Sequence, residues 1–149
     1  QVRPKSRGFI RLSDSDPRSA PVIDPCYLSD SDDIRVLREG VKLARRVFHA
    51  KAFAAIFGGD DLPAKEVVTD DQIDADIRQR AESIYHPVGT CRMGDDELAV
   101  VDSRLRVRGI SGLRVADASV MPLLISGNTN APCMMIGEKA AMCVLEDNA

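Results

Sequence analysis

Two polar segments of this 149-residue chain carry the side chains best suited to chemistry. The first, 86–94, contains His86, one of only two histidines, and the second, 126–132, contains Asn128. A neutral imidazole can accept a proton near neutral pH, and an amide side chain can orient an oxygen by hydrogen bonding. The residues alone leave simpler interpretations open, because His86 could be a packing side chain and Asn128 could cap a helix.

The cysteines predict neither a metal site nor a redox pair, because none lies within two residues of another and the CxxC spacing is absent. Free thiols in a reducing compartment are the simpler interpretation, and the cytoplasm fits. A Cys–His hydrolase built on Cys91 is a second hypothesis, but no nucleophile elbow or third orienting residue supports it. The four cysteines are Cys26, Cys91, Cys133 and Cys143.

The composition excludes several classes of protein. Hydrophobic residues at 44% and charged residues at 29% are typical of a globular protein. The net charge of −3, without a concentrated basic patch, argues against a nucleic-acid partner. No apolar run approaches the roughly 18 residues of a transmembrane helix, so we expect no membrane span. We expect a cytoplasmic protein, with peripheral membrane association as the remaining option.

Two β-prone runs near the N-terminus, 8–12 and 21–28, enclose a turn-forming cluster at 13–17. They predict a β-hairpin, and two prolines in the second run place it at a sheet edge or in a loop. A single hairpin is not stable alone in water, so we expect partner strands outside this chain.

Apolar residues at helical spacing from Ile34 to Phe48 predict an amphipathic helix with its N-cap and acidic first turn at 31–33. Helical conformation is expected to continue through 52–57 and to stop at Gly58. A solvated basic face is expected opposite the apolar stripe. That face comprises Arg35, Arg38, Lys42, Arg45 and Arg46.

Two further helices are expected. Thr69 and Gln72 match a capping box, which predicts a helix from Asp70 to about Ser83. A five-residue strand is expected at 113–117, followed by a polar loop and a helix from about residue 130 to Leu145. The last helix is expected to pack one side, formed by Met135, Ile136, Ala140, Cys143 and Val144.

Four ordered segments together resemble the carboxy-terminal region of the glucose–methanol–choline (GMC) oxidoreductases, which are FAD-dependent alcohol oxidases and dehydrogenases. At the position of Asn128 the family has either a second histidine or an asparagine. Asparagine at this position resembles the choline-dehydrogenase and alcohol-dehydrogenase-like members. Cys26 stands where asparagine is common. The four segments are 86–94, 101–107, 113–122 and 126–132.

The resemblance implies an α+β fragment. Residues 1–95 would be part of the substrate-binding domain, a mainly antiparallel sheet with helices. Residues 96–149 would be the last strand and helix of the FAD-binding α/β domain. Because no GxGxxG fingerprint occurs in this chain, the main FAD cradle is expected in an amino-terminal part of the same polypeptide.

The resemblance also implies roles for individual residues. His86 would remove the hydroxyl proton of a small alcohol while a hydride passes to flavin N5, giving an aldehyde or ketone. Asn128 would hydrogen-bond the substrate oxygen. A non-catalytic binding relative with the same fold is the alternative. The residues expected to contact FAD are Asp117, Ala118, Thr129, Asn130, Ala131 and Pro132.

Overall fold

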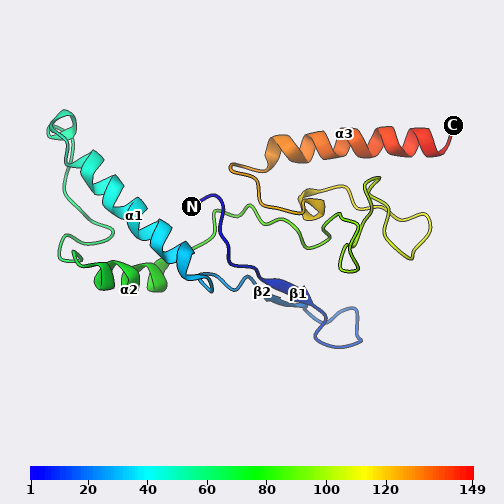
Figure 1. Cartoon of the computed structure of the whole chain (residues 1–149), viewed down its shortest axis with the longest axis horizontal. Helices are drawn as coiled ribbons and strands as arrows, with labels where there is room; N and C mark the ends of the chain where they lie inside the picture. The colour runs from blue at the N-terminus through cyan, green and yellow to red at the C-terminus, as the bar shows by residue number, and fades with distance from the viewer. The chain divides into compact units, whose positions relative to one another are not determined.

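Three α-helices, two short 3-10 helices and one β-hairpin make up the regular structure of the chain, in a computed structural model that describes residues 1–149 (Figure 1). The expected α+β class is confirmed. No helix combines the length and apolar character needed to cross a membrane. The elements are β1 (Phe9–Arg11), β2 (Val22–Asp24), α1 (Ser31–Phe48), η1 (Lys51–Phe53), α2 (Asp70–Arg80), η2 (Ala118–Val120) and α3 (Asn130–Asp147).

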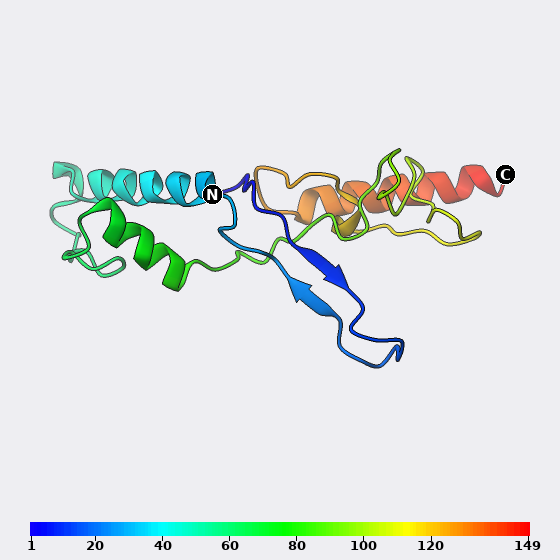
Figure 2. The same cartoon turned by 60° about the horizontal axis from the view of Figure 1, so that its bottom comes forward.

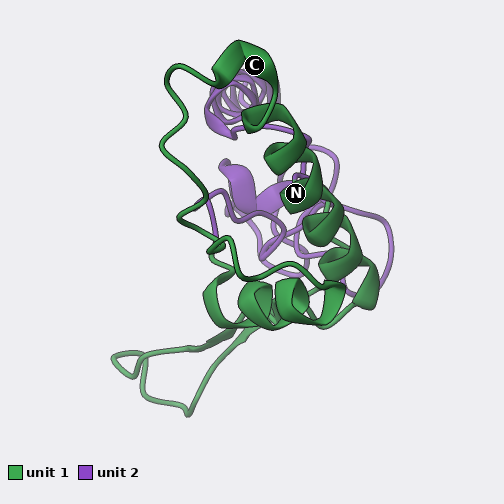
Figure 3. Cartoon of the chain, turned by 90° about the vertical axis from the view of Figure 1, so that its left-hand side faces the viewer, with its two compact units in different colours: residues 1, 3–82 green, residues 2, 83–149 purple.

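The chain forms two compact units (Figure 3). One comprises residues 1 and 3–82, with the hairpin, α1, η1 and α2, and the other comprises residues 2 and 83–149, with η2 and α3. His86 and the start of α3 belong to the same unit. The functional division at residues 95 and 96 stays a prediction.

The predicted hairpin is present, with β1 and β2 antiparallel and Ile10 opposite Ile23 (Figure 2). Gly8 is required beside it, because a Cβ at this position would collide with the carbonyl oxygen of Asp24. Phe9, Ile10 and Ile23 are all exposed. A sheet of two short strands therefore leaves much of its apolar surface exposed within this chain.

After β2 the chain turns through Cys26, whose φ of 48° lies in the left-handed region. Its N–H donates to Oδ1 of Asp24 at 2.8 Å, and its carbonyl accepts from the N–H of Ser29. Asparagine adopts this conformation more easily than most residues that carry a Cβ. Backbone geometry therefore explains why asparagine suits position 26 and cysteine is a strained replacement.

The N-cap of α1 is Asp30, one residue before the expected cap, and its carboxylate accepts from the N–H of Asp32. Asp33 is only 2% exposed. It accepts hydrogen bonds from the N–H groups of Lys5 and Ser6, from the Ser6 hydroxyl, and from the Gln1 amide. This carboxylate therefore ties the N-terminal segment to α1.

The expected continuation of α1 through 52–57 is wrong, because Ala50 has an extended ψ of 147° and only the 3-10 helix η1 follows. The capping box of α2 is confirmed, with the Thr69 hydroxyl accepting from the N–H of Gln72. Helix α2 ends at Arg80, short of Ser83, because Ala81 is extended.

The expected solvated face of α1 is only partly correct. Arg35 and Arg46 are exposed. Arg38 and Arg45, however, are only 21% and 20% exposed in their side chains, because α2 and the connector before it cover them. Arg38 pairs with Asp74 of α2 at 2.7 Å, and Lys42 pairs with Asp70 at 2.7 Å.

Arg45 holds the connector between the two helices. Its Nη2 donates to the carbonyls of Pro63 and Ala64 at 2.9 Å each, and its Nη1 donates to the carbonyl of Val67. Helix α2 lies alongside α1 in both views, with Ile34, Ile73 and Ile77 buried (Figures 1 and 2). The basic residues of α1 therefore act mainly as contacts between elements.

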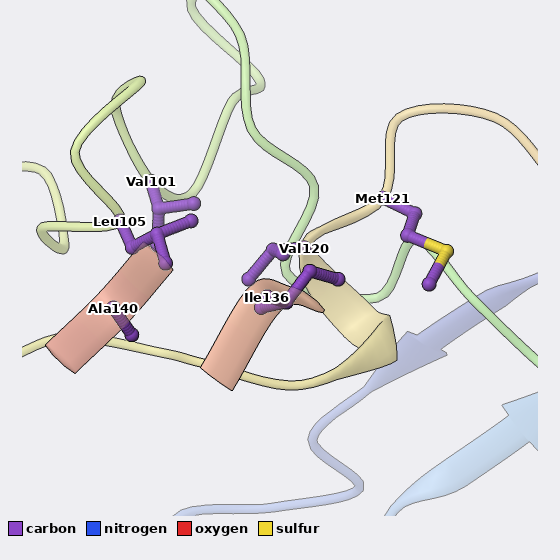
Figure 4. Close-up of a cluster of buried hydrophobic side chains, with 6 residues drawn as sticks. All are labelled: Val101, Leu105, Val120, Met121, Ile136 and Ala140. Atoms are coloured by element: carbon purple, nitrogen blue, oxygen red, sulfur yellow. The ribbon is translucent and has the colours of Figure 1, made fainter. Parts of the chain in front are cut away.

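The second unit has one apolar cluster, which joins the loop at 101–105 and η2 to one side of α3 (Figure 4). The predicted strand at 113–117 is wrong. Only an isolated bridge between Arg106 and Arg114 forms there, because this chain offers that segment no continuous ladder partner. The buried members of the cluster are Val101, Leu105, Val120, Met121, Ile136 and Ala140.

Apolar residues lie on several sides of α3, and this chain covers only one of them. Ile136 and Ala140 are buried and Cys143 is half-buried, as expected, but Met135 and Val144 are exposed. A helix that is apolar all round is normally buried all round. Met134, Met142 and Leu145 are exposed as well.

Candidate active site

Hydrogen bonds to η2 fix the loop that carries His86. The N–H of Cys91 donates to the carbonyl of Ser119 at 2.9 Å. The N–H of Met93 donates to the carbonyl of Val120 at 2.8 Å. The loop has no regular secondary structure, yet these two hydrogen bonds tie the segment after His86 to the turn before α3.

Two left-handed backbone positions flank His86. Tyr85 has a φ of 61°, which is strained for a residue with a Cβ, and Gly89 has a φ of 91°. A Cβ at Gly89 would also lie 3.3 Å from the carbonyl oxygen of Met121, so glycine suits this position. Strained backbone of this kind is concentrated at functional sites.

His86 contacts Thr129 across 43 residues of sequence. Nδ1 of the ring lies 2.9 Å from the Thr129 hydroxyl oxygen. Thr129 is only 9% exposed, whereas His86 is half-buried. Nε2 makes no hydrogen bond within the chain. One ring nitrogen is therefore anchored and the other is available to a ligand.

The N-terminus of α3 lacks a side-chain cap, although Thr129 is its N-cap residue. Pro132, the third residue of the helix, has no N–H, and the N–H of Cys133 donates to the carbonyl of Thr129 at 3.0 Å. The N–H groups of Asn130 and Ala131 therefore lack helical partners. They lie at the positive end of an 18-residue helix, where an electron-rich group is favoured.

Asn128 is exposed and forms no hydrogen bond within the chain. Because the N-cap is Thr129, the helix-cap interpretation of Asn128 is wrong. Asn128 directly precedes in the sequence the threonine that contacts His86, and its amide makes no hydrogen bond within the chain.

Asp117 caps η2, since its Oδ1 accepts from the N–H of Ser119 at 2.8 Å. Hydrogen bonds from the hydroxyl and then the N–H of Ser119 hold the pKa of Asp117 below its ordinary value of 3.8. Ala118 is half-buried and packs against the apolar cluster. These two residues shape the turn before α3, and their contact with a cofactor stays a prediction.

The geometry gives the Cys–His hydrolase hypothesis no support. The Cys91 thiol is half-buried and makes no hydrogen bond with His86, whose Nδ1 faces Thr129. Arg92 forms a two-pronged ion pair with Asp96, at 2.8 and 2.6 Å. An activated thiolate would need a base or cation beside it, and neither is directed at Cys91.

The contact between Thr129 and His86 is the feature that sequence reasoning missed, because Thr129 was expected to contact the cofactor. A signal for it is present at Pro132. A threonine N-cap normally accepts from the N–H of the second or third helical residue, and the third residue here is proline, which has none. The hydroxyl of Thr129 is thus left for another partner.

The sequence matches a known family over most of its length. A sequence model described as GMC oxidoreductase matches residues 4–137. The chain belongs to the GMC oxidoreductase family. The resemblance drawn from the four motif segments is therefore confirmed.

Two curated relatives are identical to this chain at about half of the aligned positions. Alcohol dehydrogenase (acceptor) of Pseudomonas putida is 53% identical over 142 residues, covering 95% of this chain and 26% of the relative. Oxygen-dependent choline dehydrogenase of Rhizobium rhizogenes is 50% identical over 143 residues, with the same two shares. The chain therefore spans about a quarter of the length of these relatives.

Solved structures agree with this assignment. A formate oxidase of Aspergillus oryzae, crystallised to examine its FAD modification, has a TM-score of 0.90 to this chain. The two are 30% identical, over 98% of this chain and 26% of the oxidase. The same arrangement of elements therefore occurs in a larger protein that carries FAD.

Proposed function

We propose that this chain is the carboxy-terminal part of an FAD-dependent alcohol oxidoreductase in which His86 is the proton acceptor. The observation that carries the proposal is the His86 ring, held through Nδ1 by Thr129 with Nε2 unpartnered. Membership of the GMC family and the names of the relatives support this activity.

The residues at the start of α3 fit FAD. The uncapped N–H groups of Asn130 and Ala131 suit an electron-rich ring edge, and Pro132 fixes the first helical turn. The backbone of Thr129, together with Asp117 and Ala118, completes the proposed contact set, while the Thr129 side chain stays on His86. The phosphate cradle lies outside this chain, which has no GxGxxG segment. When bound, FAD supplies at flavin N5 the acceptor for the hydride that leaves the alcohol carbon.

His86 and Asn128 have different roles at the substrate oxygen. Nε2 of His86 accepts the hydroxyl proton, and Nδ1 stays on Thr129. The Asn128 amide donates a hydrogen bond to the same oxygen, which orients the hydroxyl and stabilises developing negative charge. A binding-only relative would need neither group, which makes the non-catalytic alternative the weaker one.

The partners follow from this assignment. The substrate is a small alcohol, and the amino-terminal part of the same polypeptide supplies the rest of the FAD site. The four unpaired cysteines support a reducing location, for which we propose the cytoplasm.

The test uses the full-length polypeptide, purified and mixed anaerobically with a panel of primary aliphatic alcohols and choline. The proposal predicts flavin absorption in the isolated protein and loss of that absorption on mixing with at least one alcohol. Bound flavin that no alcohol reduces would favour the non-catalytic alternative. A full-length protein without flavin would contradict the proposal outright.

A further inference from the structure

Thr129 is a buried polar residue, and one of the two backbone N–H groups that normally bind its hydroxyl is missing. At an N-cap, a threonine oxygen normally accepts from the N–H of the second or third helical residue. The third residue here is Pro132, which has no N–H, and Thr129 makes no side-chain cap bond. Its one hydrogen-bond partner is Nδ1 of His86, at 2.9 Å.

The direction of this hydrogen bond determines which nitrogen of His86 can accept a proton. If Nδ1 carries the proton and donates to Thr129, Nε2 has a free lone pair. If the hydroxyl donates to Nδ1, Nε2 carries the proton and can only donate. In a neutral histidine, the partner of one nitrogen sets the proton position on the other.

We propose that Thr129 is a positioning residue that accepts from Nδ1–H of His86 and thereby keeps Nε2 unprotonated and directed to the substrate. The inference rests on the proposed function, because it concerns the proton acceptor of that reaction. Two further observations support it. Thr129 is nearly inaccessible, so water competes little for its hydroxyl, and its backbone carbonyl is fixed by the N–H of Cys133.

The backbone on the other side of the contact is equally constrained. Proline at position 87 restricts His86 to extended conformations, and Tyr85 before it is held at a positive φ. Loss of the hydroxyl would therefore free the ring to rotate and to exchange tautomers, with little movement of the main chain.

The experiment compares Thr129→Val, which removes the hydroxyl at nearly constant volume, with Thr129→Ser, which keeps it. Both are made in the full-length enzyme, and flavin reduction by alcohol is followed by anaerobic stopped flow. Thr129→Val should reduce the limiting rate roughly tenfold, the scale of one hydrogen bond, with FAD content and the apparent substrate affinity nearly unchanged. Thr129→Ser should restore most of the rate.

A second readout observes the tautomer directly. The enzyme is labelled with ¹⁵N-histidine, and solid-state ¹⁵N spectra are assigned to His86 by difference from His86→Gln. Unliganded enzyme should show a protonated Nδ1 and an unprotonated Nε2, and Thr129→Val should shift protons towards Nε2. A wild-type ring protonated on Nε2, or a Thr129→Val variant with the wild-type rate, would overturn the inference.

Failure of this inference can be distinguished from failure of the proposed function. If Thr129→Val is fully active while His86→Gln is strongly impaired, the positioning role is wrong and the proton acceptor stands. If His86→Gln reduces its flavin at the wild-type rate, the proposed function itself fails. A loss of FAD from Thr129→Val would show that Thr129 supports the cofactor site and would also overturn the positioning role.

Discussion

At the scale of single residues, two groups are proposed to act on the oxygen of the substrate. His86 is anchored through one nitrogen, and Asn128 is exposed without an internal partner. Neither side chain makes contacts on which the fold of the rest of the chain depends. Changes at these positions should therefore alter chemistry more than folding.

Asn128→Ala should leave FAD bound and lower the rate of flavin reduction by roughly 100- to 1000-fold, the usual cost of one preorganised donor to a developing oxyanion. Anaerobic stopped flow of the full-length enzyme measures that rate. Asn128→His, which keeps a hydrogen-bond donor, is the control and should lose much less. An Asn128→Ala enzyme with the wild-type rate would exclude Asn128 from the mechanism.

Asp33 is the residue whose titration should affect stability. Burial opposes its charge, but hydrogen bonds from Ser6, from the N–H of Lys5 and from Gln1 outweigh that effect and lower its pKa from 3.8 to about 2. Because the folded pKa is the lower one, its stabilisation is fully present above pH 3.8. It is lost as the pH falls from 3.8 towards 2, and amounts to about 2 kcal/mol.

Asp33→Asn should therefore release the N-terminal segment from α1 at neutral pH. The measurement is hydrogen exchange of the peptide spanning residues 1–12. Relative to wild type, the loss of protection in Asp33→Asn should be constant down to about pH 4 and should become smaller below that pH. Asp30→Asn is the matched control, because asparagine caps a helix as well as aspartate does. Equal protection in wild type and Asp33→Asn would show that this carboxylate does not hold the segment.

At the scale of elements, the contacts of α1 show which features a sequence pattern predicts. The capping box of α2 is encoded by Thr69 and Gln72, three residues apart, and it was predicted correctly. The helical spacing places Arg38 and Arg45 on a solvated face. Their hydrogen-bond partners, however, lie 18 to 36 residues away in the sequence. Local spacing contains no information about such partners.

The absence of information about distant partners also explains which features of the candidate site were predicted and which were missed. The motif residues were found from local sequence, but the contact between His86 and Thr129 spans 43 residues and was missed. The strand expected at 113–117 is wrong for the opposite reason, because local sequence predicted an element that long-range pairing does not support. Its residues favour extended structure, yet a strand also needs a neighbour, and this chain supplies one isolated bridge.

Arg45 gives a test of these long-range contacts. Arg45→Met removes three hydrogen bonds to the carbonyls of the 60–68 connector and should destabilise that segment by roughly 2 to 3 kcal/mol. Hydrogen exchange and limited proteolysis of the full-length protein should show the connector opening. Arg46→Met, the adjacent exposed arginine, should change protection little. Equal effects from the two variants would contradict the assignment.

At the scale of the whole molecule, the chain leaves much apolar surface exposed on two of its elements. The hairpin exposes Phe9, Ile10 and Ile23, and α3 exposes Met135 and Leu145. About three quarters of the length of the curated relatives lies outside the matched region. The unpaired strand edges and the uncovered side of α3 are consistent with contacts to that remainder.

The isolated 149-residue chain should therefore retain no FAD, because the phosphate cradle is missing from it. Its exposed apolar surface should also cause self-association. Gel filtration with absorbance at flavin wavelengths and light scattering measures both properties. Flavin that co-elutes with the chain, or a monodisperse monomer, would contradict the corresponding part of this prediction.

The central claim is that His86 takes the proton of the alcohol, and the most direct measurement is the rate of flavin reduction across pH 5.5 to 10 in the full-length enzyme. The base must be unprotonated before hydride leaves, so the wild-type rate should rise with pH. His86→Ala should lower the rate by roughly 100- to 10,000-fold and abolish this rise, with FAD content nearly unchanged. A His86→Ala enzyme that keeps the wild-type rate and pH profile would contradict the account.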